Sequence, residues 1–503
     1  MKKITGTSLS VEEVAGIARD GGRVELDAEA RARMEESAAL VEVLASGDDP
    51  AYGISTGFGA LATTFIPEGR RVELQHSLVR SHAAGSGPLV EREVVRAMML
   101  LRARTLAMGY SGARPVLVDR LLALLGEGVT PLVHEYGSLG ASGDLAPLAH
   151  VALALIGEGK VEFGGEVVEA SAALRALGLD PLVLRSKEGL SLINGTDGIL
   201  GMLCLAIVDS ASLLDLADVA AAMTTEALLG TDRPFVPELH ELRPHPGQAE
   251  SAARLLALLE GSPIVASHRH DDPRVQDAYS IRCTPQVNGA ARDTLAHVRR
   301  TADAELVSAI DNPVILQDGS VESVGNFHGA PLGLVADFAA IALAEVGAIA
   351  ERRMDRMLDP ARSHGLPPFL TPEPGVRSGF MIAHYAAVSM AAENRRLASP
   401  ASVDSMPTSA MQEDHVSMAW GAARKLRTVI GNVRRILATE VLIAAQALDL
   451  RAPLVPAVRT GGVRDAVRGV VPFLDEDRVL ADDIQAVERL AADGSLVEAS
   501  RLA

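Results

Sequence analysis

"EDHVSMAWGAARKLRTVIGNVRRILATEVLIAAQALDL" occupies residues 413–450 and contains no proline. Strong helix formers such as alanine, leucine and arginine recur along it, so this stretch predicts one long helix. Residues 332–354, "LGLVADFAAIALAEVGAIAERRM", predict a second long helix, because their apolar side chains repeat at helical spacing. The residues of that apolar stripe are Val335, Phe338, Ala339, Ala342, Val346 and Ile349. Long helices with alanine-rich faces typically form an extended bundle or a subunit interface.

The first 200 or so residues have a different texture, in which helical stretches alternate with glycine-rich connectors. In "KVEFGGEVVEA", residues 160–170, the pair Gly164-Gly165 predicts the turn of a small β-hairpin. We therefore expect a mainly α-helical protein with two domains. The expected domains are a smaller mixed one over residues 1–200 and a long-helix bundle over residues 201–503.

The composition excludes several classes of function. A formal net charge of −18 argues against nucleic-acid binding, which needs clustered Lys and Arg. The cysteines, Cys204 and Cys283, share no motif spacing, which excludes a disulfide framework and a thiolate metal cluster and is typical of a reducing compartment. The N-terminus lacks the apolar run of a signal peptide, and no charge-free apolar run reaches membrane-spanning length. We therefore expect a cytoplasmic protein without membrane contact.

Residues 137–144, "GSLGASGD", place several small residues around Ser142. The spacing fits a flexible connector. It is one residue shorter than the Gly-x-Ser-x-Gly motif of a serine hydrolase, and the Gly-Lys-Ser/Thr sequence of a phosphate-binding loop does not follow it. A further chemistry also fits, because the amide nitrogen of Gly143 carries no hindering side chain and can approach the Ala141 carbonyl. Ring closure with loss of water, and dehydration of Ser142, would leave an electrophilic methylidene made from backbone alone. Spacing by itself leaves the connector and the electrophile both open.

Two further stretches carry candidate chemistry. In "VQDAYSIRCTPQ", the residues Gln276, Tyr279 and Arg282 lie three apart, so one helical turn or a tight loop can point them the same way. Arginine can grip a carboxylate and tyrosine can transfer protons, although an ordinary surface ion pair explains the pattern equally well. "SHRHDD", residues 267–272, contains letters typical of metal ligands, but such clusters are more often polar loops, and we expect no metal.

Taken together, ordered motifs along nearly the whole chain resemble the histidine branch of the aromatic amino-acid ammonia-lyases. These motifs are "YGISTGFGAL", "SLVRSHAAG", "GSLGASGDLAPLAH", "LINGTDG", "RVQDAYSIRCTPQ", "DNPV", "GNFHGAP", "RSHGLPPFL" and "MPTSAMQEDHVSM". The resemblance implies that Ala141-Ser142-Gly143 forms 4-methylidene-imidazol-5-one autocatalytically, with no metal and no pyridoxal phosphate. It also implies an aspartase/fumarase-like, mainly α-helical fold, assembled as a homotetramer with sites shared between subunits.

The same resemblance implies roles for single residues. The substrate's amino group would add to the methylidene derived from Ser142, and Tyr52 would remove a β-proton. Arg282, helped by Asn194, would hold the substrate carboxylate. Ammonia would then leave, and an α,β-unsaturated acid would remain. The other implied site residues are Tyr279 and Gln276 beside the electrophile, with Tyr279 among the catalytic ones, and Phe327 near the substrate.

The resemblance implies that substrate choice depends on Ser81-His82 in "RSHAAG". At these two positions tyrosine lyases typically have His-Leu and phenylalanine lyases typically have Phe-Leu. His82 together with Glu413 suits an imidazole, which can donate and accept hydrogen bonds, better than a phenyl ring. The implied reaction converts L-histidine to trans-urocanate and ammonia, the first step of histidine degradation. A lyase or 2,3-aminomutase for another aromatic amino acid is the rival within the family. Asp197 and Met411 stand where Gln and Asn are common, and neither carries the implied chemistry.

Overall fold

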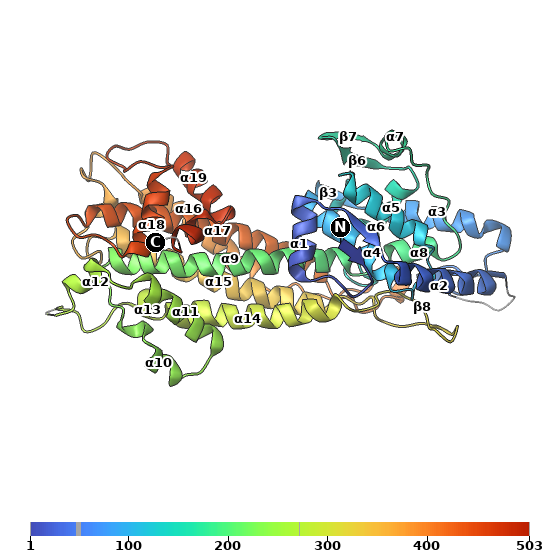
Figure 1. Ribbon diagram of the computed structural model, residues 1–503, viewed down its shortest axis with the longest axis horizontal. Coiled ribbons are helices and arrows are strands. Elements are labelled where there is room, and N and C mark those ends of the chain that lie inside the picture. Colours follow the sequence, from blue (N-terminus) through green and yellow to red (C-terminus); the bar gives the residue numbers. More distant parts are fainter. Residues whose placement is uncertain (1, 47–51, 271, 502–503) are drawn as a thin grey trace. The chain divides into compact units, whose positions relative to one another are not determined.

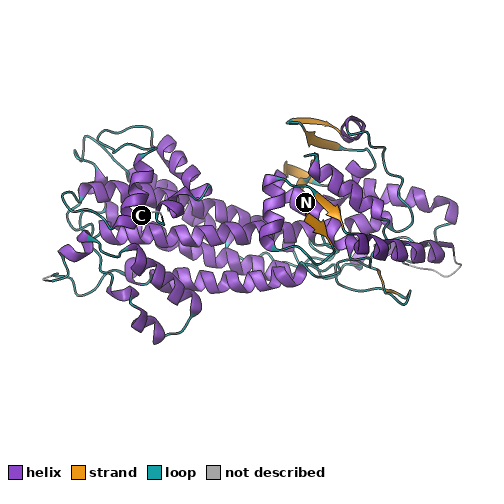
Figure 2. Ribbon diagram, viewed as in Figure 1, coloured by secondary structure: helices purple, strands orange, loops and turns teal. Residues whose placement is uncertain are grey.

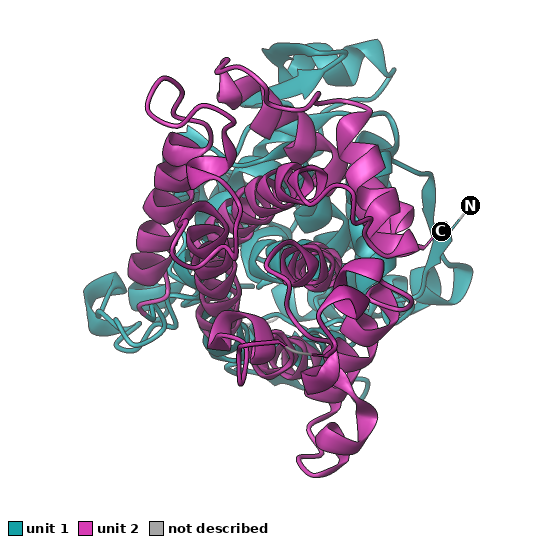
Figure 3. Cartoon of the chain, turned by 90° about the vertical axis from the view of Figure 1, so that its left-hand side faces the viewer, with its two compact units in different colours: residues 1–208, 299–337, 400–424 teal, residues 209–298, 338–399, 425–503 magenta. Residues whose placement is uncertain are grey.

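The computed structural model describes residues 2–46, 52–270 and 272–501. Helices dominate the described residues, and the strands are short (Figure 2). The chain divides into two compact units (Figure 3). Unit 1 comprises residues 1–208, 299–337 and 400–424, and unit 2 comprises residues 209–298, 338–399 and 425–503.

Unit 1 is built around helix α4, which is buried from Val94 to Ala107. The guanidinium of Arg96 on α4 donates to Ile17 O and Ala18 O near the end of α1 and to Leu125 O near the end of α5. One buried side chain therefore satisfies carbonyls that two helix ends leave unpaired. The helices that lie wholly in unit 1 are α1 (Val11–Asp20), α2 (Ala28–Ser46), α3 (Arg71–His82), α4 (Arg92–Ala107), α5 (Pro115–Gly126), α6 (Leu145–Leu155), α7 (Ala170–Ala176) and α8 (Glu188–Ile193).

The named strands form four small sheets, all in unit 1. In the three-stranded sheet, the antiparallel pair β6–β7 is the predicted hairpin, with Gly164 at φ 61 and Gly165 at φ 84. Two successive positive φ values are typical of the turn that matches strand twist, so the prediction is confirmed. The strands are β1 (Lys2–Ile4), β2 (Val24–Leu26), β3 (Ser86–Leu89), β4 (Thr130–Pro131), β5 (His134–Tyr136), β6 (Lys160–Phe163), β7 (Glu166–Glu169), β8 (Val314–Ile315) and β9 (Val321–Glu322).

Four long helices contribute residues to both units, and Figure 1 labels them. They are α9 (Asp197–Ala227), α14 (Thr284–Glu305), α15 (Ala330–Leu358) and α17 (Ala419–Leu450). Because the chain passes between units within these helices, the two compact units do not coincide with the expected continuous domains 1–200 and 201–503. The two long helices predicted from periodicity are present, but α17 begins at Ala419 rather than at residue 413.

Unit 2 contains helices but no named strand among its described residues. Within it, the buried Arg353 of α15 pairs with Glu440 of α17 at 2.5 Å, and Glu440 also accepts the Thr224 hydroxyl of α9 at 2.8 Å. This paired charge joins three long helices in the unit. Its other helices are α10 (Pro237–Glu241), α11 (Pro246–Leu258), α12 (Pro263–Ser267), α13 (Tyr279–Arg282), α16 (Met381–Leu397), α18 (Val458–Arg468), α19 (Leu480–Ala492) and α20 (Ser495–Ala499).

The apolar stripe predicted on α15 is only partly buried. Val335, Ala339 and Val346 are buried as expected, whereas Phe338 is 46% exposed. Leu334 and Ile341 share this exposed face at helical spacing, so α15 is apolar on more than one side. Two helices, α9 and α15, are long and apolar enough to cross a membrane, but 72% and 56% of their most apolar windows are buried inside the chain. Buried core helices share these properties.

Candidate active site

The loop at residues 137–144 is bent against the segment that follows α8. Gly143 has φ 68 and forms an isolated bridge with Gly195, while Asp144 N–H donates to Gly195 O at 2.7 Å. A Cβ atom at Gly143 would lie 2.2 Å from the Gly195 carbonyl oxygen, which no side chain tolerates. This position therefore requires glycine for both its backbone conformation and its close backbone contact.

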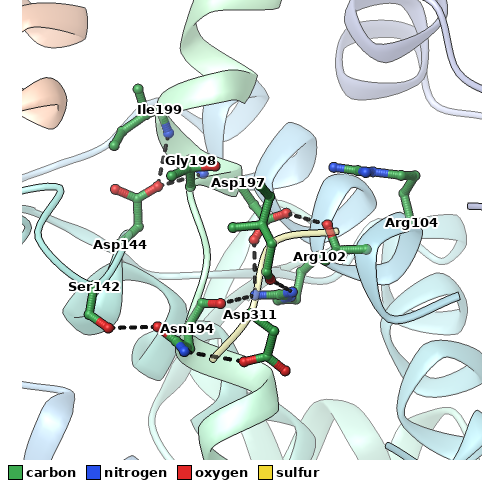
Figure 4. A network of polar contacts seen from close by, with 12 residues as sticks. Arg102, Arg104, Ser142, Asp144, Asn194, Asp197, Gly198, Ile199 and Asp311 are labelled. Atoms are coloured by element: carbon green, nitrogen blue, oxygen red, sulfur yellow. Dashed lines mark hydrogen bonds and ion pairs between the residues drawn. The ribbon is translucent and has the colours of Figure 1, made fainter. Parts of the chain in front are cut away.

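Ser142 is half-buried, and its hydroxyl donates to Oδ1 of Asn194 at 2.7 Å (Figure 4). Asn194 directly follows α8 as its C-terminal capping residue, and its side chain is buried. Two residues that the sequence motifs assigned to the site are thus in direct contact. Ala141, the first member of the tripeptide, is also buried.

Asp144, whose role the sequence left unassigned, caps the N-terminus of α9. Its carboxylate accepts the backbone N–H groups of Gly198 at 2.8 Å and Ile199 at 3.0 Å, together with the Ser138 hydroxyl at 2.8 Å. Full burial nevertheless outweighs these hydrogen bonds and raises the pKa of Asp144 to about 7. The residue fixes the loop at residues 137–144 to a helix end, and only its non-local contacts reveal this.

We expect this buried carboxyl to make stability depend on pH. Because folding raises its pKa from 3.8 to about 7, the stabilising contribution of the protonated form is complete below pH 3.8 and is lost as the pH rises towards 7. Asp144→Asn cannot ionise at this position. The Tm of the variant should therefore rise relative to the Tm of the wild type between pH 5 and pH 8. Thermal unfolding of both proteins at these two pH values measures the change. A difference that stays constant with pH would contradict this assignment.

Two motifs distant in sequence contact the same loop. Gly329 N–H, in the "GNFHGAP" motif, donates to Gly140 O at 3.1 Å, and the Ser417 hydroxyl donates to the same oxygen at 2.8 Å. Met418 N–H donates to Leu139 O at 2.8 Å. Phe327, which the motifs place near the substrate, is half-buried two residues before Gly329. The three motifs therefore come together in unit 1.

His82 is the last residue of α3, and its Nδ1 lies 2.9 Å from Leu78 O. Because a carbonyl oxygen only accepts, Nδ1 carries the hydrogen in this contact, which leaves Nε2 as the acceptor of the neutral ring. Burial lowers the pKa of His82, and the nearby charge of Glu413 opposes this effect. Glu413 in turn accepts the Thr408 hydroxyl at 3.0 Å. A neutral imidazole and a carboxylate thus lie close to one another.

Tyr52 is half-buried, and its hydroxyl oxygen accepts the N–H of Gly59 at 3.1 Å. Its ring packs edge-on against Phe58, with centroids 6.5 Å apart. The short helix that begins at Gly59 contacts the short helix Ser409–Met411, two residues before Glu413. These contacts fix the position of the Tyr52 oxygen within unit 1.

Gln276, Tyr279 and Arg282 belong to unit 2. Tyr279 and Arg282 begin and end α13, and the guanidinium carbon lies 4.6 Å from the ring centroid. Tyr279 is 69% exposed, and Gln276 is exposed just before the helix. The Nε of Arg282 donates to Asp277 O at 3.0 Å. Tyr279 and Arg282 therefore contact one another as a cation–π pair.

The stretch 267–272 makes contacts typical of a polar loop. His268 Nε2 lies 3.1 Å from Gly230 O, and Asp272 pairs with Arg274 at 2.6 Å. Asp271, the remaining acidic candidate next to His270, lies outside the described residues.

Comparison with known proteins decides the family. The family description "Aromatic amino acid lyase" matches residues 9–469. The chain belongs to this family. It is 55% identical to the histidine ammonia-lyase of Streptomyces avermitilis over 99% of this chain and 98% of that protein, and 50% identical to that of Gloeobacter violaceus over 99% and 96%.

Solved structures of the family have the same fold. The histidine ammonia-lyase of Trypanosoma cruzi matches with a TM-score of 0.92 and 40% identity, covering 100% of this chain and 95% of that one. The tyrosine aminomutase of Streptomyces globisporus matches with a TM-score of 0.94 and 40% identity, covering 99% and 98%. The expected family, the mainly α-helical fold and the class of enzyme, a carbon–nitrogen lyase, are thereby confirmed.

Proposed function

We propose that this enzyme eliminates ammonia from L-histidine to give trans-urocanate, using 4-methylidene-imidazol-5-one formed from Ala141-Ser142-Gly143. The observation that carries the proposal is the bend at Gly143, where the backbone has φ 68 and a Cβ atom would meet the Gly195 carbonyl. The bend favours close approach of the Gly143 nitrogen to the Ala141 carbonyl, so these residues fit the prosthetic group. When formed, this group supplies an electrophile that accepts the substrate's amino group and makes it a better leaving group.

Tyr52 is the proposed base for the β-proton. Its hydroxyl oxygen is held in place by the N–H of Gly59, and its ring is held by Phe58. Fixing the base matters because a β-proton is weakly acidic, so its removal depends on close positioning. The proton would move from the substrate's β-carbon to the Tyr52 oxygen.

His82 and Glu413 are the proposed partners of the substrate imidazole. Neutral His82 offers the Nε2 lone pair, and Glu413 offers a carboxylate oxygen, so both can accept an N–H. A phenyl ring has no N–H donor and would leave both partly buried acceptors unpaired, whereas the substrate imidazole supplies a ring N–H to at least one of them. Curated relatives named histidine ammonia-lyase, at 55% and 50% identity, support the same substrate.

Gln276, Tyr279 and Arg282 are proposed to complete a site in an assembly of four copies. Exposed apolar side chains at helical spacing on two helices support self-association, because a single chain leaves these faces in water. They are Leu334, Phe338 and Ile341 on α15, and Ile382, Tyr385 and Val388 on α16. Arg282 would then hold the substrate carboxylate, Tyr279 would act among the catalytic groups, and the exposed Tyr279 and Gln276 would lie beside the electrophile.

Substrate comparison tests this function. The purified protein is incubated separately with L-histidine, L-tyrosine and L-phenylalanine, and products are followed by absorbance and chromatography. We expect urocanate from histidine and no unsaturated acid from the other two. The chain is also similar to a tyrosine aminomutase, so the products are examined for a β-amino acid as well. An unsaturated or β-amino product from tyrosine alone would overturn the assignment of His82 and Glu413.

Glu413→Gln should reduce histidine turnover far more than formation of the prosthetic group. The variant keeps the size of the side chain and its contact with Thr408, but it replaces an acceptor-only carboxylate with an amide. Loss of one charge-assisted hydrogen bond predicts a decrease in kcat/KM of about ten- to a hundredfold. Intact mass reports prosthetic-group formation in the same sample. Equal loss of both properties would indicate a structural role for Glu413.

A further inference from the structure

The side chain of Asn194 lies between Ser142 and Asp311 (Figure 4). Its Oδ1 accepts the Ser142 hydroxyl at 2.7 Å. Its Nδ2 donates to Oδ1 of Asp311 at 3.2 Å and to the carbonyl of Asn312 at 3.0 Å. Both N–H bonds of the amide are therefore used on the side away from the reactive serine. This orientation leaves Asn194 no free donor for the substrate carboxylate, so it does not fit the expectation that Asn194 helps Arg282 to hold that group.

Chemistry fixes this orientation of the amide. The Asp311 carboxylate and the Asn312 carbonyl can only accept hydrogen bonds, whereas the Ser142 hydroxyl can either donate or accept. Turning the amide over would place its oxygen against two acceptors inside a buried site. The oxygen of Asn194 must therefore face Ser142 for as long as the Asp311 carboxylate and the Asn312 carbonyl hold their present positions.

Asp311 is itself held by a buried lysine. Nζ of Lys187 donates to Oδ2 of Asp311 at 2.8 Å, to Ser111 O at 3.0 Å and to Oγ of Ser191 at 3.2 Å. Lys187 and Asp311 are both buried, so each charge depends on the other for compensation. The ammonium uses all three of its donors, which leaves it no free bond for chemistry of its own.

We propose that Lys187 and Asp311 are positioning residues that keep the oxygen of Asn194 facing the substrate's amino group. This inference rests on the proposed function, in which that amino group adds at the methylidene derived from Ser142. An amine carries N–H donors, so an acceptor is the useful group at this position, and a reversed amide would oppose N–H to N–H. The guanidinium of Arg102 holds the backbone of the same residue by donating to Asn194 O at 2.9 Å.

Asp311→Asn tests the proposal because asparagine has one acceptor oxygen, whereas Asp311 uses one oxygen for Asn194 and the other for Lys187. The ammonium of Lys187 attracts that oxygen, so the new amide turns its N–H groups towards Asn194 and favours the reversed orientation. We expect kcat/KM for histidine, expressed per matured chain by intact mass, to fall about ten- to a hundredfold. Glu188→Gln is the matched control, because Glu188 is also a buried carboxylate of unit 1 and is paired with Arg114. Its turnover should stay within about threefold of the wild type.

A second substitution should rescue the first. In Lys187→Met/Asp311→Asn no ammonium attracts the oxygen of the new amide, so this oxygen can again accept from Asn194. We expect the double variant to recover at least about fivefold in kcat/KM over Asp311→Asn. If Asp311→Asn does not fold, the kcat/KM of the double variant must still lie within about tenfold of the wild-type value.

Two outcomes would overturn the positioning role. One is an Asp311→Asn variant as active as the Glu188→Gln control, and the other is a double variant no better than Asp311→Asn. Inactivity of the wild-type protein towards histidine would instead overturn the proposed function, so the two failures are distinguishable.

Discussion

Ser142→Ala is expected to lose histidine turnover by at least about a thousandfold, while the protein keeps its helical fold. Alanine has no hydroxyl to lose as water, so the exocyclic methylidene cannot form. The structural cost is small, because the Ser142 hydroxyl makes one hydrogen bond, to Asn194, from a half-buried position. Loss of that bond costs about 1 kcal/mol, which a large helical protein tolerates. Near-ultraviolet absorbance, turnover and circular dichroism measure the three effects separately.

Ser37→Ala provides the matched control for this variant. Ser37 is buried in unit 1, and its oxygen accepts the N–H of Gly112 at 3.1 Å, so the variant also removes one serine hydroxyl from a folded region. It should keep both the chromophore and turnover. Retained turnover or chromophore in Ser142→Ala would refute the assignment of the electrophile.

Gly143→Ala should block prosthetic-group formation and also destabilise the fold by about 2–4 kcal/mol. The added Cβ atom would lie 2.2 Å from Gly195 O, and a residue at φ 68 already carries a conformational cost with any side chain. Relief of the clash requires the loop to move away from the segment of Asn194. Urea unfolding measures the stability, and intact mass measures whether the ring has formed.

Gly126→Ala is the matched control for Gly143→Ala, because it shows the effect of adding a methyl group at a glycine that has free space around it. Gly126 ends α5, is exposed, and has no atom within 4 Å of an added Cβ. Alanine is the better helix former, so this variant should be neutral or up to about 1 kcal/mol more stable. Equal stability of the Gly143 and Gly126 variants would contradict the account of the bend.

The sequence predicted features that depend on local interactions. The hairpin at 160–170 follows from two adjacent glycines, and the long helices follow from their composition and periodicity. The start of α17 was predicted too early, because Met418 adopts φ 53 and its N–H donates to Leu139 O, a contact with a distant segment.

Site features that depend on distant contacts were not predictable in this way. Asp144 binds the N-terminus of α9 and Lys187 binds Asp311, and no local sequence pattern around either residue predicts these contacts. Lys187 and Asp311 are far apart in the chain, so spacing gives no sign that they pair. Phe338 belongs to the apolar stripe predicted on α15, yet it is exposed in the single chain while Val335, Ala339 and Val346 of the same stripe are buried. In each case tertiary packing, rather than local pattern, determines the contact.

Formation of the electrophile from Ala141-Ser142-Gly143 is measured by the intact mass of the purified protein, combined with a urocanate absorbance assay. We expect the chain to be lighter than its sequence by one water from ring closure and one from dehydration of Ser142, and we expect it to form urocanate from L-histidine. A mass equal to that of the unmodified sequence would show that the prosthetic group does not form.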